Sequence, residues 1–137
     1  MSADLASAPE NSSPPPPRRR SWSAKFADAF RGLKLGVRGH SSFFVHFFLA
    51  LVVLAAAVTL RLGLLQWCML IGCITAVIAA ELFNSAIEVL CRTLEVERLP
   101  QGRAPLDIAA GAVLAVSIGA AVIGVIVFAA RLVELLG

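Results

Sequence analysis

Three long apolar stretches restrict the folds that this chain can adopt. They cover residues 43–60, 64–91 and 105–130, which is most of the sequence after its first third. A helix crosses a bilayer core of roughly 30 Å with about 20 residues, because each residue adds 1.5 Å. With 58% hydrophobic residues, the chain also holds more apolar side chains than an ordinary soluble domain. The pattern therefore predicts an all-α membrane protein with three transmembrane helices.

The N-terminal region is polar and divides into two parts. Residues 1–23 combine Ser, Ala, four consecutive prolines and three consecutive arginines, a composition that predicts a disordered tail. Residues 24–38 are amphipathic and predict a helix that lies on the membrane surface, so residues 24–137 form a single membrane domain. The apolar positions of this surface helix, at spacings of four, three and four, are Phe26, Phe30, Leu33 and Val37.

Positive charge predicts the orientation of the spans. The N-terminal region and the segment 92–107 together hold ten of the twelve Lys and Arg residues, so both are expected on the cytoplasmic side of the cell (inner) membrane. This makes the chain a multi-pass protein with a cytoplasmic N-terminus. The basic region suits an anionic lipid surface, and no pattern of a nucleic-acid-binding module is present, so nucleic acid is not an expected partner.

Four polar residues lie in the far part of the second stretch at helical spacing. Glu81, Asn84, Ser85 and Glu88 stand at i, i+3, i+4 and i+7, so they lie on one face of a helix. Ionisable groups next to lipid are costly, and such a face therefore meets protein, water or a ligand. One interpretation is metal-assisted phosphoryl transfer, with one carboxylate as base and the other holding a cation. The other is a helix that leaves the membrane and bonds to its neighbours.

Three further residues are candidates with simpler alternatives. Asp107 falls in the first turn of the third span, where it either stabilises the helix dipole or orients a nucleotide or its metal. His40 and His46 flank the start of the first span. Both are interpreted as interface residues, with a ligand role as the alternative for His40.

The acidic face carries a resemblance to a known family. The segment Glu81-Leu-Phe-Asn-Ser-Ala-Ile-Glu88 closely resembles the signature of the prokaryotic diacylglycerol kinase family, which includes undecaprenol kinases. The resemblance extends from Lys25–Lys34 in the surface helix to Asp107–Leu114 in the third span. It implies a homotrimer of three-span subunits that transfers the γ-phosphate of ATP, with Mg²⁺ or another divalent metal, to a membrane lipid. The acceptor is the hydroxyl of diacylglycerol or undecaprenol at the cytoplasmic face.

The same resemblance implies roles for individual residues. Glu81 is the expected base for the lipid hydroxyl, and Glu88 the expected ligand of the metal bound to ATP. Asn84 and Asp107 are expected at the nucleotide. The surface helix is expected to admit the lipid, and the expected lipid-binding residues are Phe30, Lys34 and Ser85.

The chain departs from the family pattern at four positions. His40 and Arg92 replace acidic residues, one of them a second metal ligand, while Leu106 and Ser21 replace basic ones. A hard cation prefers oxygen ligands, so a neutral imidazole at His40 predicts weaker Mg²⁺ binding or a changed metal preference. Arg92 follows Glu88 by one helical turn and is expected within reach of a bound phosphate, as a weak substitute for the missing charge.

These observations lead to one expectation and two alternatives. The expectation is an ATP-dependent lipid kinase with a variant nucleotide site. The first alternative is a weakened or inactive family member that acts as a lipid-binding membrane scaffold. The second, a small proton-coupled exporter, requires an acidic residue near the bilayer midplane, whereas Glu81 falls near the cytoplasmic end of its span.

Overall fold

The computed structural model describes residues 21–37, 41–95 and 98–137, and for residues 41 and 42 it describes the backbone alone. Residues 1–20 of the predicted tail and His40 lie outside the described residues, whereas Trp22 and Ser23, the last two residues assigned to the tail, belong to the first helix. All regular structure in the described part is helical, as predicted. The helices are α1 (Trp22–Val37), α2 (Ser41–Thr59), α3 (Leu64–Thr93) and α4 (Ala104–Leu136).

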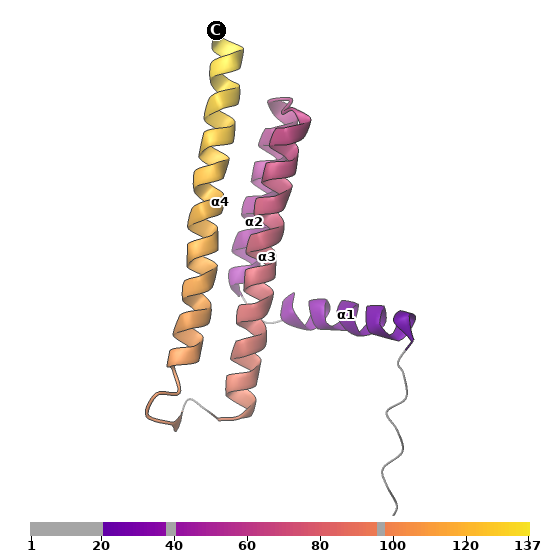
Figure 1. Ribbon diagram of the computed structural model, residues 1–137, viewed down its shortest axis with the longest axis vertical. Helices are drawn as coiled ribbons and strands as arrows, with labels where there is room; N and C mark the ends of the chain where they lie inside the picture. Colours follow the sequence, from indigo (N-terminus) through magenta and orange to yellow (C-terminus); the bar gives the residue numbers. More distant parts are fainter. Residues whose placement is uncertain (1–20, 38–40, 96–97) are drawn as a thin grey trace, which may run out of the picture.

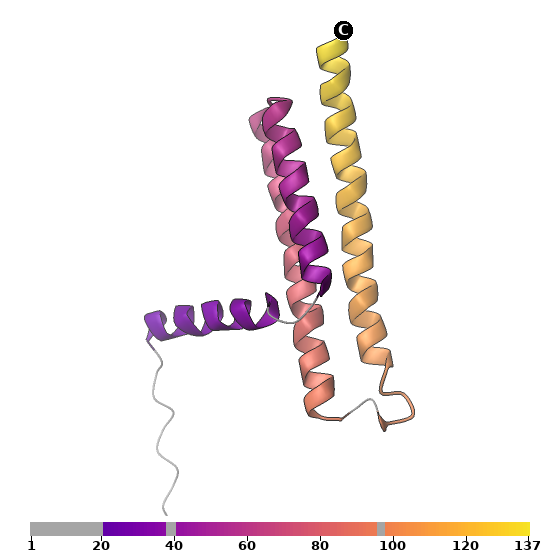
Figure 2. The same ribbon diagram turned by 180° about the vertical axis from the view of Figure 1, so that it is seen from behind.

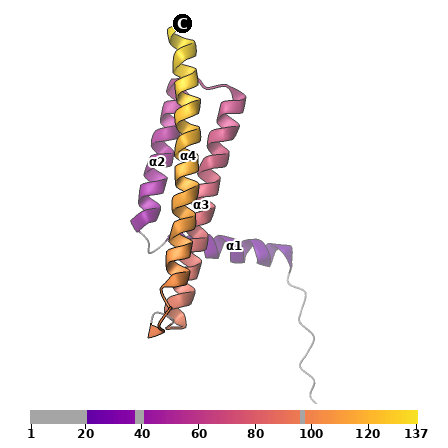
Figure 3. The ribbon, with the colours of Figure 1, turned by 60° about the vertical axis from the view of Figure 1, so that its left-hand side comes forward.

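The long helices form an elongated bundle with α1 as a side arm. In Figure 1, α2, α3 and α4 run roughly side by side, and α1 leaves the bundle at a steep angle near the start of α2. The reverse view shows the same arrangement (Figure 2). Turning the molecule brings α4 in front of the space between α2 and α3 (Figure 3). Helix α3 contacts α1, α2 and α4. The helix that carries the acidic face therefore packs against each of the other three helices.

Helix α1 begins two residues before the predicted position because Ser21 caps it. The Ser21 hydroxyl accepts a hydrogen bond from the Ala24 N–H at 3.3 Å, which satisfies one of the free amides of the first turn. Helix α1 buries no side chain in the described structure, and Phe26 and Phe30 are 64% and 69% exposed. These exposed rings agree with a helix that places one face against a membrane.

A tight reversal joins α2 to α3, as the sequence predicts, although the glycine has an unexpected part in it. Arg61 adopts the left-handed conformation with φ of 50°, and the Leu62 N–H bonds back to the Ala57 carbonyl at 3.1 Å. This is the usual ending of an α-helix, with Arg in a position that glycine commonly occupies. Gly63 instead precedes the first residue of α3, and its N–H donates to Gln66 Oε1 at 2.9 Å.

Helix α4 extends to Leu136, six residues beyond the predicted end of the third span. Its last two turns contain neither Gly nor Pro before Gly137, and Arg131 pairs with Glu134 one turn later at 2.8 Å. The hydropathy of the sequence falls at this polar pair, and the span was therefore predicted to end near residue 130. The helix itself continues because its residues are good helix formers.

Two helices in the described part of the chain, α3 and α4, are long and apolar enough to cross a membrane. The apolar stretch of α2, Phe43–Thr59, is shorter. The whole of α2 has 19 residues and is about 28 Å long, close to the thickness of a bilayer core. The prediction of three apolar helices is therefore met by two long candidate spans and one shorter apolar helix.

The best-buried apolar cluster lies at the end of the bundle that holds the reversal. Ala57 of α2, Leu70 of α3 and Val127 of α4 meet there and are at most 4% exposed. Arg131 adds a polar connection, because its Nε donates to the Leu60 carbonyl at 3.0 Å. This contact fixes α4 against the end of α2, at the end of the bundle opposite the acidic face.

Candidate functional site

The acidic face of α3 changes from buried to exposed along the helix. Glu81 and Ser85 are each 2% exposed, Asn84 is half-buried, and the Glu88 side chain is 22% exposed. Seven residues separate the two carboxylates, which places them about 10 Å apart along the helix axis. A carboxylate in apolar surroundings and a carboxylate near water therefore lie on one continuous face.

Glu81 is held by a histidine from α2. Its Oε1 lies 3.1 Å from His46 Nε2, and the two side chains are 3% and 20% exposed. An ionised carboxylate in such surroundings is costly unless it is hydrogen-bonded or paired. The contact joins the first apolar helix to the acidic face.

Glu88 is engaged by Arg92 of the next turn. Arg92 Nη2 donates to Glu88 Oε1, and the Arg92 side chain is 67% exposed. The substitution at residue 92 thus places a cation directly on the carboxylate expected to meet the metal. The guanidinium must move away before that oxygen can bind a metal ion.

A divalent metal fits this face only together with a nucleotide. Within the described residues no three His, Cys, Asp or Glu side chains are close enough to hold a metal ion. Mg²⁺ is commonly held by one or two carboxylates, with substrate phosphates and water completing the shell. Glu88 fits the part of a single protein carboxylate for a metal that arrives bound to ATP. His40, the other predicted ligand, lies outside the described residues.

Asp107 lies at the same end of the bundle as Glu88. It is exposed in the first turn of α4, and its backbone N–H bonds to the Arg103 carbonyl at 3.0 Å. Helices α3 and α4 are antiparallel, and Val77 lines the same groove as Ser117. Continuing that register towards the loop brings Asp107 to about the level of Glu88. Within the described residues the Asp107 carboxylate makes no hydrogen bond. Glu88 and Asp107 therefore lie at the same end of the bundle without a hydrogen bond between them.

A groove of about 670 Å³ lies between α1 and α3. Ser85 lines it, and the buried Ser85 hydroxyl has no hydrogen-bond partner among the described residues. The α1 side of the groove is formed by Leu33, Leu35 and the small residues Ala29, Gly32 and Gly36. Phe30 and Lys34, the other two predicted lipid contacts, are exposed on α1 and do not line the groove. The structure thus separates Ser85 from the two residues with which the resemblance grouped it.

His46 is the residue that sequence reasoning assigned to the membrane interface and that the structure places on Glu81. The signal for this contact was present in the sequence. His46 lies 13 residues before the end of α2, and Glu81 lies 17 residues after the start of α3. In an antiparallel pair joined by a tight reversal, these positions differ by about one helical turn. Their pairing follows once the reversal near Arg61 is accepted.

Comparison with known proteins places the chain in a family. Residues 27–128 match the prokaryotic diacylglycerol kinase family. The chain is also similar to an undecaprenol kinase from Bacillus subtilis (strain 168), with 29% identity over 107 residues, covering 78% of this chain and 87% of that protein. No solved structure matches it. The matched region begins in α1 and ends in α4, so it includes the complete acidic face of α3, and the chain belongs to the prokaryotic diacylglycerol kinase family, whose members are ATP-dependent membrane lipid kinases.

Proposed function

We propose that this protein transfers the γ-phosphate of ATP to the hydroxyl of diacylglycerol or undecaprenol at the cytoplasmic face of the membrane. The observation that carries the proposal is the placement of Glu81. It is a carboxylate that is 2% exposed, on a helix long enough to span a bilayer, one helical turn from a buried hydroxyl. A buried carboxylate of this kind is well suited to accept a proton from a lipid hydroxyl, because no bulk water competes for it.

The proposed reaction divides the work between the two ends of the acidic face. Glu81 accepts the proton of the lipid hydroxyl, the lipid oxygen forms a bond to the γ-phosphorus, and the bond between that phosphorus and the β-phosphate oxygen breaks. ADP leaves, and the proton on Glu81 passes to water. Mg²⁺ enters as part of the MgATP substrate and supplies positive charge to the phosphates. Glu88 supplies a carboxylate to that metal, while Asn84 and Asp107 orient the nucleotide.

The lipid is proposed to enter beside α1. The groove between α1 and α3 is almost entirely apolar, yet its wall includes the Ser85 hydroxyl, which has no hydrogen-bond partner among the described residues. A lipid with a terminal hydroxyl matches this combination, since its apolar body fills the groove and its hydroxyl bonds to Ser85. Ser85 follows Glu81 by one helical turn, so the same hydroxyl lies within reach of the base.

We also propose the homotrimer that the family resemblance implies. Helix α4 supports it with a row of small residues, because Gly111, Ala115 and Gly119 are exposed in the single chain. A methyl group added at either glycine would meet nothing within 4 Å. Rows of small residues allow the close approach of membrane helices. Crosslinking in micelles should yield a species of three chains.

One observation favours a second candidate, the lipid-binding scaffold. Arg92 engages Glu88, the carboxylate that a metal–nucleotide complex would need. With Leu106 in place of a lysine, the nucleotide end also lacks a cation that the family pattern has. In the scaffold the lipid groove works as proposed, and phosphate transfer is weak or absent.

The deciding experiment measures transfer of labelled γ-phosphate from ATP to diacylglycerol and, separately, to undecaprenol. Purified protein in mixed micelles is assayed with Mg²⁺, Mn²⁺ and Zn²⁺ in turn. Phosphorylation of either lipid supports the kinase and identifies the acceptor, and the metal series reports the effect of His40. No product with any lipid or metal, from folded protein that still binds lipid, favours the scaffold. Leu106→Lys and His40→Glu are then the substitutions expected to restore transfer.

A further inference from the structure

The contact between His46 and Glu81 has no place in the reaction outlined above. That reaction needs Glu81 ionised and aimed at a lipid hydroxyl, although its surroundings are apolar. Removing an unpaired carboxylate from water costs several kcal/mol. His46 Nε2, at 3.1 Å, is the polar atom that meets the Glu81 carboxylate among the described residues.

We propose that His46 is a positioning residue, whose Nε2–H donates to Glu81 Oε1 and aims Oε2 at the lipid hydroxyl. The inference rests on the proposed kinase function, because it assigns a task to the base of that reaction. A hydrogen bond to one oxygen limits rotation of the carboxyl group and lowers the cost of keeping it ionised. The second oxygen keeps its lone pairs for the substrate proton.

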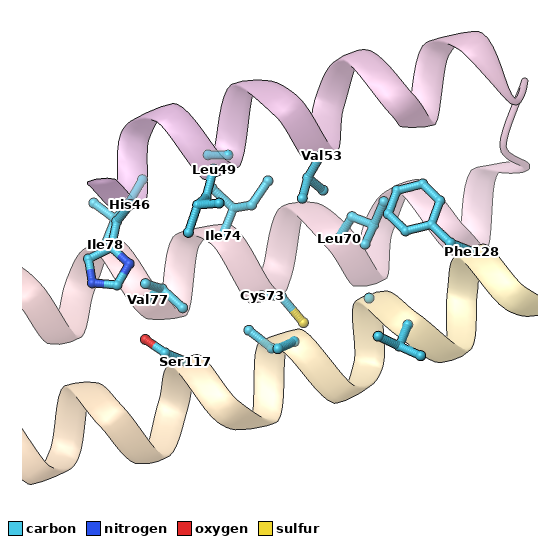
Figure 4. Close-up of a pocket in the computed structure, with 15 residues that line it drawn as sticks. His46, Leu49, Val53, Leu70, Cys73, Ile74, Val77, Ile78, Ser117 and Phe128 are labelled. Atoms are coloured by element: carbon cyan, nitrogen blue, oxygen red, sulfur yellow. The ribbon is translucent and has the colours of Figure 1, made fainter. Parts of the chain in front are cut away.

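The surroundings of His46 favour this arrangement. The ring leaves α2 at one end of a groove of about 550 Å³ between α2, α3 and α4, and Figure 4 shows it beside Ile78 with the Ser117 hydroxyl on the facing helix. Most other side chains around this groove are aliphatic, and none of them is acidic or basic. Apart from His46, the described side chains that line this groove therefore offer no charged partner to the Glu81 carboxylate.

Two substitutions at His46 separate positioning from packing. His46→Leu removes the donor and keeps an apolar side chain of similar size. His46→Gln keeps an N–H at nearly the distance of Nε2 from the backbone but cannot become charged. Ser117→Ala is the matched control, since it removes a polar atom from the same groove that has no hydrogen-bond partner within the described residues.

We expect His46→Leu to lower kcat by roughly 10- to 100-fold, the usual effect of removing the partner that orients a functional side chain. The KM values for ATP and for lipid should change less than about twofold, because no contact to either substrate is removed. His46→Gln should recover most of the loss, and Ser117→Ala should match the wild type. In a Glu81→Gln background, His46→Leu should cause no further loss, since the carboxylate that it positions is already absent.

A second readout needs no turnover. Infrared spectra of protein with isotope-labelled glutamate contain a carboxylate band that Glu81→Gln removes. His46→Leu should shift or remove the same band, His46→Gln should retain it, and Ser117→Ala should leave it in place. If the wild-type protein showed no turnover, the proposed function would be contradicted. The infrared spectrum would then still test the contact between His46 and Glu81.

Three results would overturn the inference. The first is wild-type kcat in His46→Leu while the unsubstituted protein is active. The second is an equal loss of kcat in Ser117→Ala, which would assign the effect to packing of the groove. The third is an unshifted carboxylate band in His46→Leu, which would mean that the contact does not hold Glu81.

Discussion

Replacing Glu81 by Gln removes a proton acceptor and changes little else at that position. The side chain is 3% exposed and meets His46 through Oε1. A glutamine has the same number of heavy atoms, and its carbonyl oxygen can accept the same hydrogen bond. Removing a negative charge from a membrane helix also relieves a cost of as much as about 3 kcal/mol. We therefore expect the free energy of unfolding of Glu81→Gln to stay the same or to rise.

The rate should fall steeply, in contrast with the stability. A positioned general base contributes about 10²- to 10⁴-fold to a rate, and at 1.36 kcal/mol per factor of ten this is about 3–5 kcal/mol. Water cannot easily take over as base where the carboxylate is 2% exposed. The proposed metal ligand Glu88 lies about 10 Å along α3, and the substitution removes no proposed nucleotide contact, so the KM for ATP should change by less than about twofold.

The assay is steady-state transfer of labelled phosphate at saturating ATP and lipid, with unfolding in mixed micelles as the check on folding. Glu88→Gln is the matched variant, because it makes the same chemical change two turns further along α3. It should chiefly raise the KM for the metal–nucleotide complex. If folded Glu81→Gln retained more than a tenth of the wild-type kcat, Glu81 would not be the base.

Three further substitutions test the neighbouring parts of the site. A Cβ at Gly36 would come within 2.7 Å of the Leu82 side chain, so Gly36→Val should displace α1 and raise the KM for lipid with little change in kcat. Because Arg92 bonds to Glu88, Arg92→Gln should free that carboxylate and lower the Mg²⁺ concentration for half-maximal activity. The same substitution removes a positive charge near the phosphates, so it should raise the KM for ATP roughly tenfold. Arg131→Met removes a bond from α4 to the end of α2 and should lower the free energy of unfolding by about 1–2 kcal/mol in a denaturation series, with kcat unchanged.

The apolar helices and the acidic face could be predicted because each depends on local sequence. The stretch from Leu64 to Ala80 is apolar apart from Gln66 and Thr75, and the spacing of Glu81 and Glu88 fixes their common side of a helix. Neither conclusion requires knowledge of which helix lies next to which. The amphipathic pattern of α1 is local in the same way, and it placed that helix within two residues of its observed start.

The contacts between helices were harder to foresee because they depend on register and on side-chain size. The pattern of α1 drew attention to its phenylalanines, yet Ala29, Gly32 and Gly36 line the groove against α3. A periodicity argument weights large apolar residues, whereas close contact between helices is made where side chains are small. Arg92 was expected within reach of a phosphate, and the structure places it on Glu88, its neighbour one helical turn away.

The different lengths of α2 and α3 explain how one helix face can serve two substrates of opposite polarity. Helix α2 has 19 residues and α3 has 30, so α3 continues beyond the start of α2 at the end that holds the acidic face. Glu81 is still opposite α2, where it contacts His46, a residue that also lines the apolar groove. Glu88 lies two turns further along α3, beyond the level at which α2 begins. The exposed Arg92 bonds to it there. A lipid hydroxyl and a nucleotide phosphate could thus approach the same face from the apolar side and from the aqueous side. Under the proposed function, the phosphoryl group would be transferred in the space of about 10 Å along α3 between the two carboxylates.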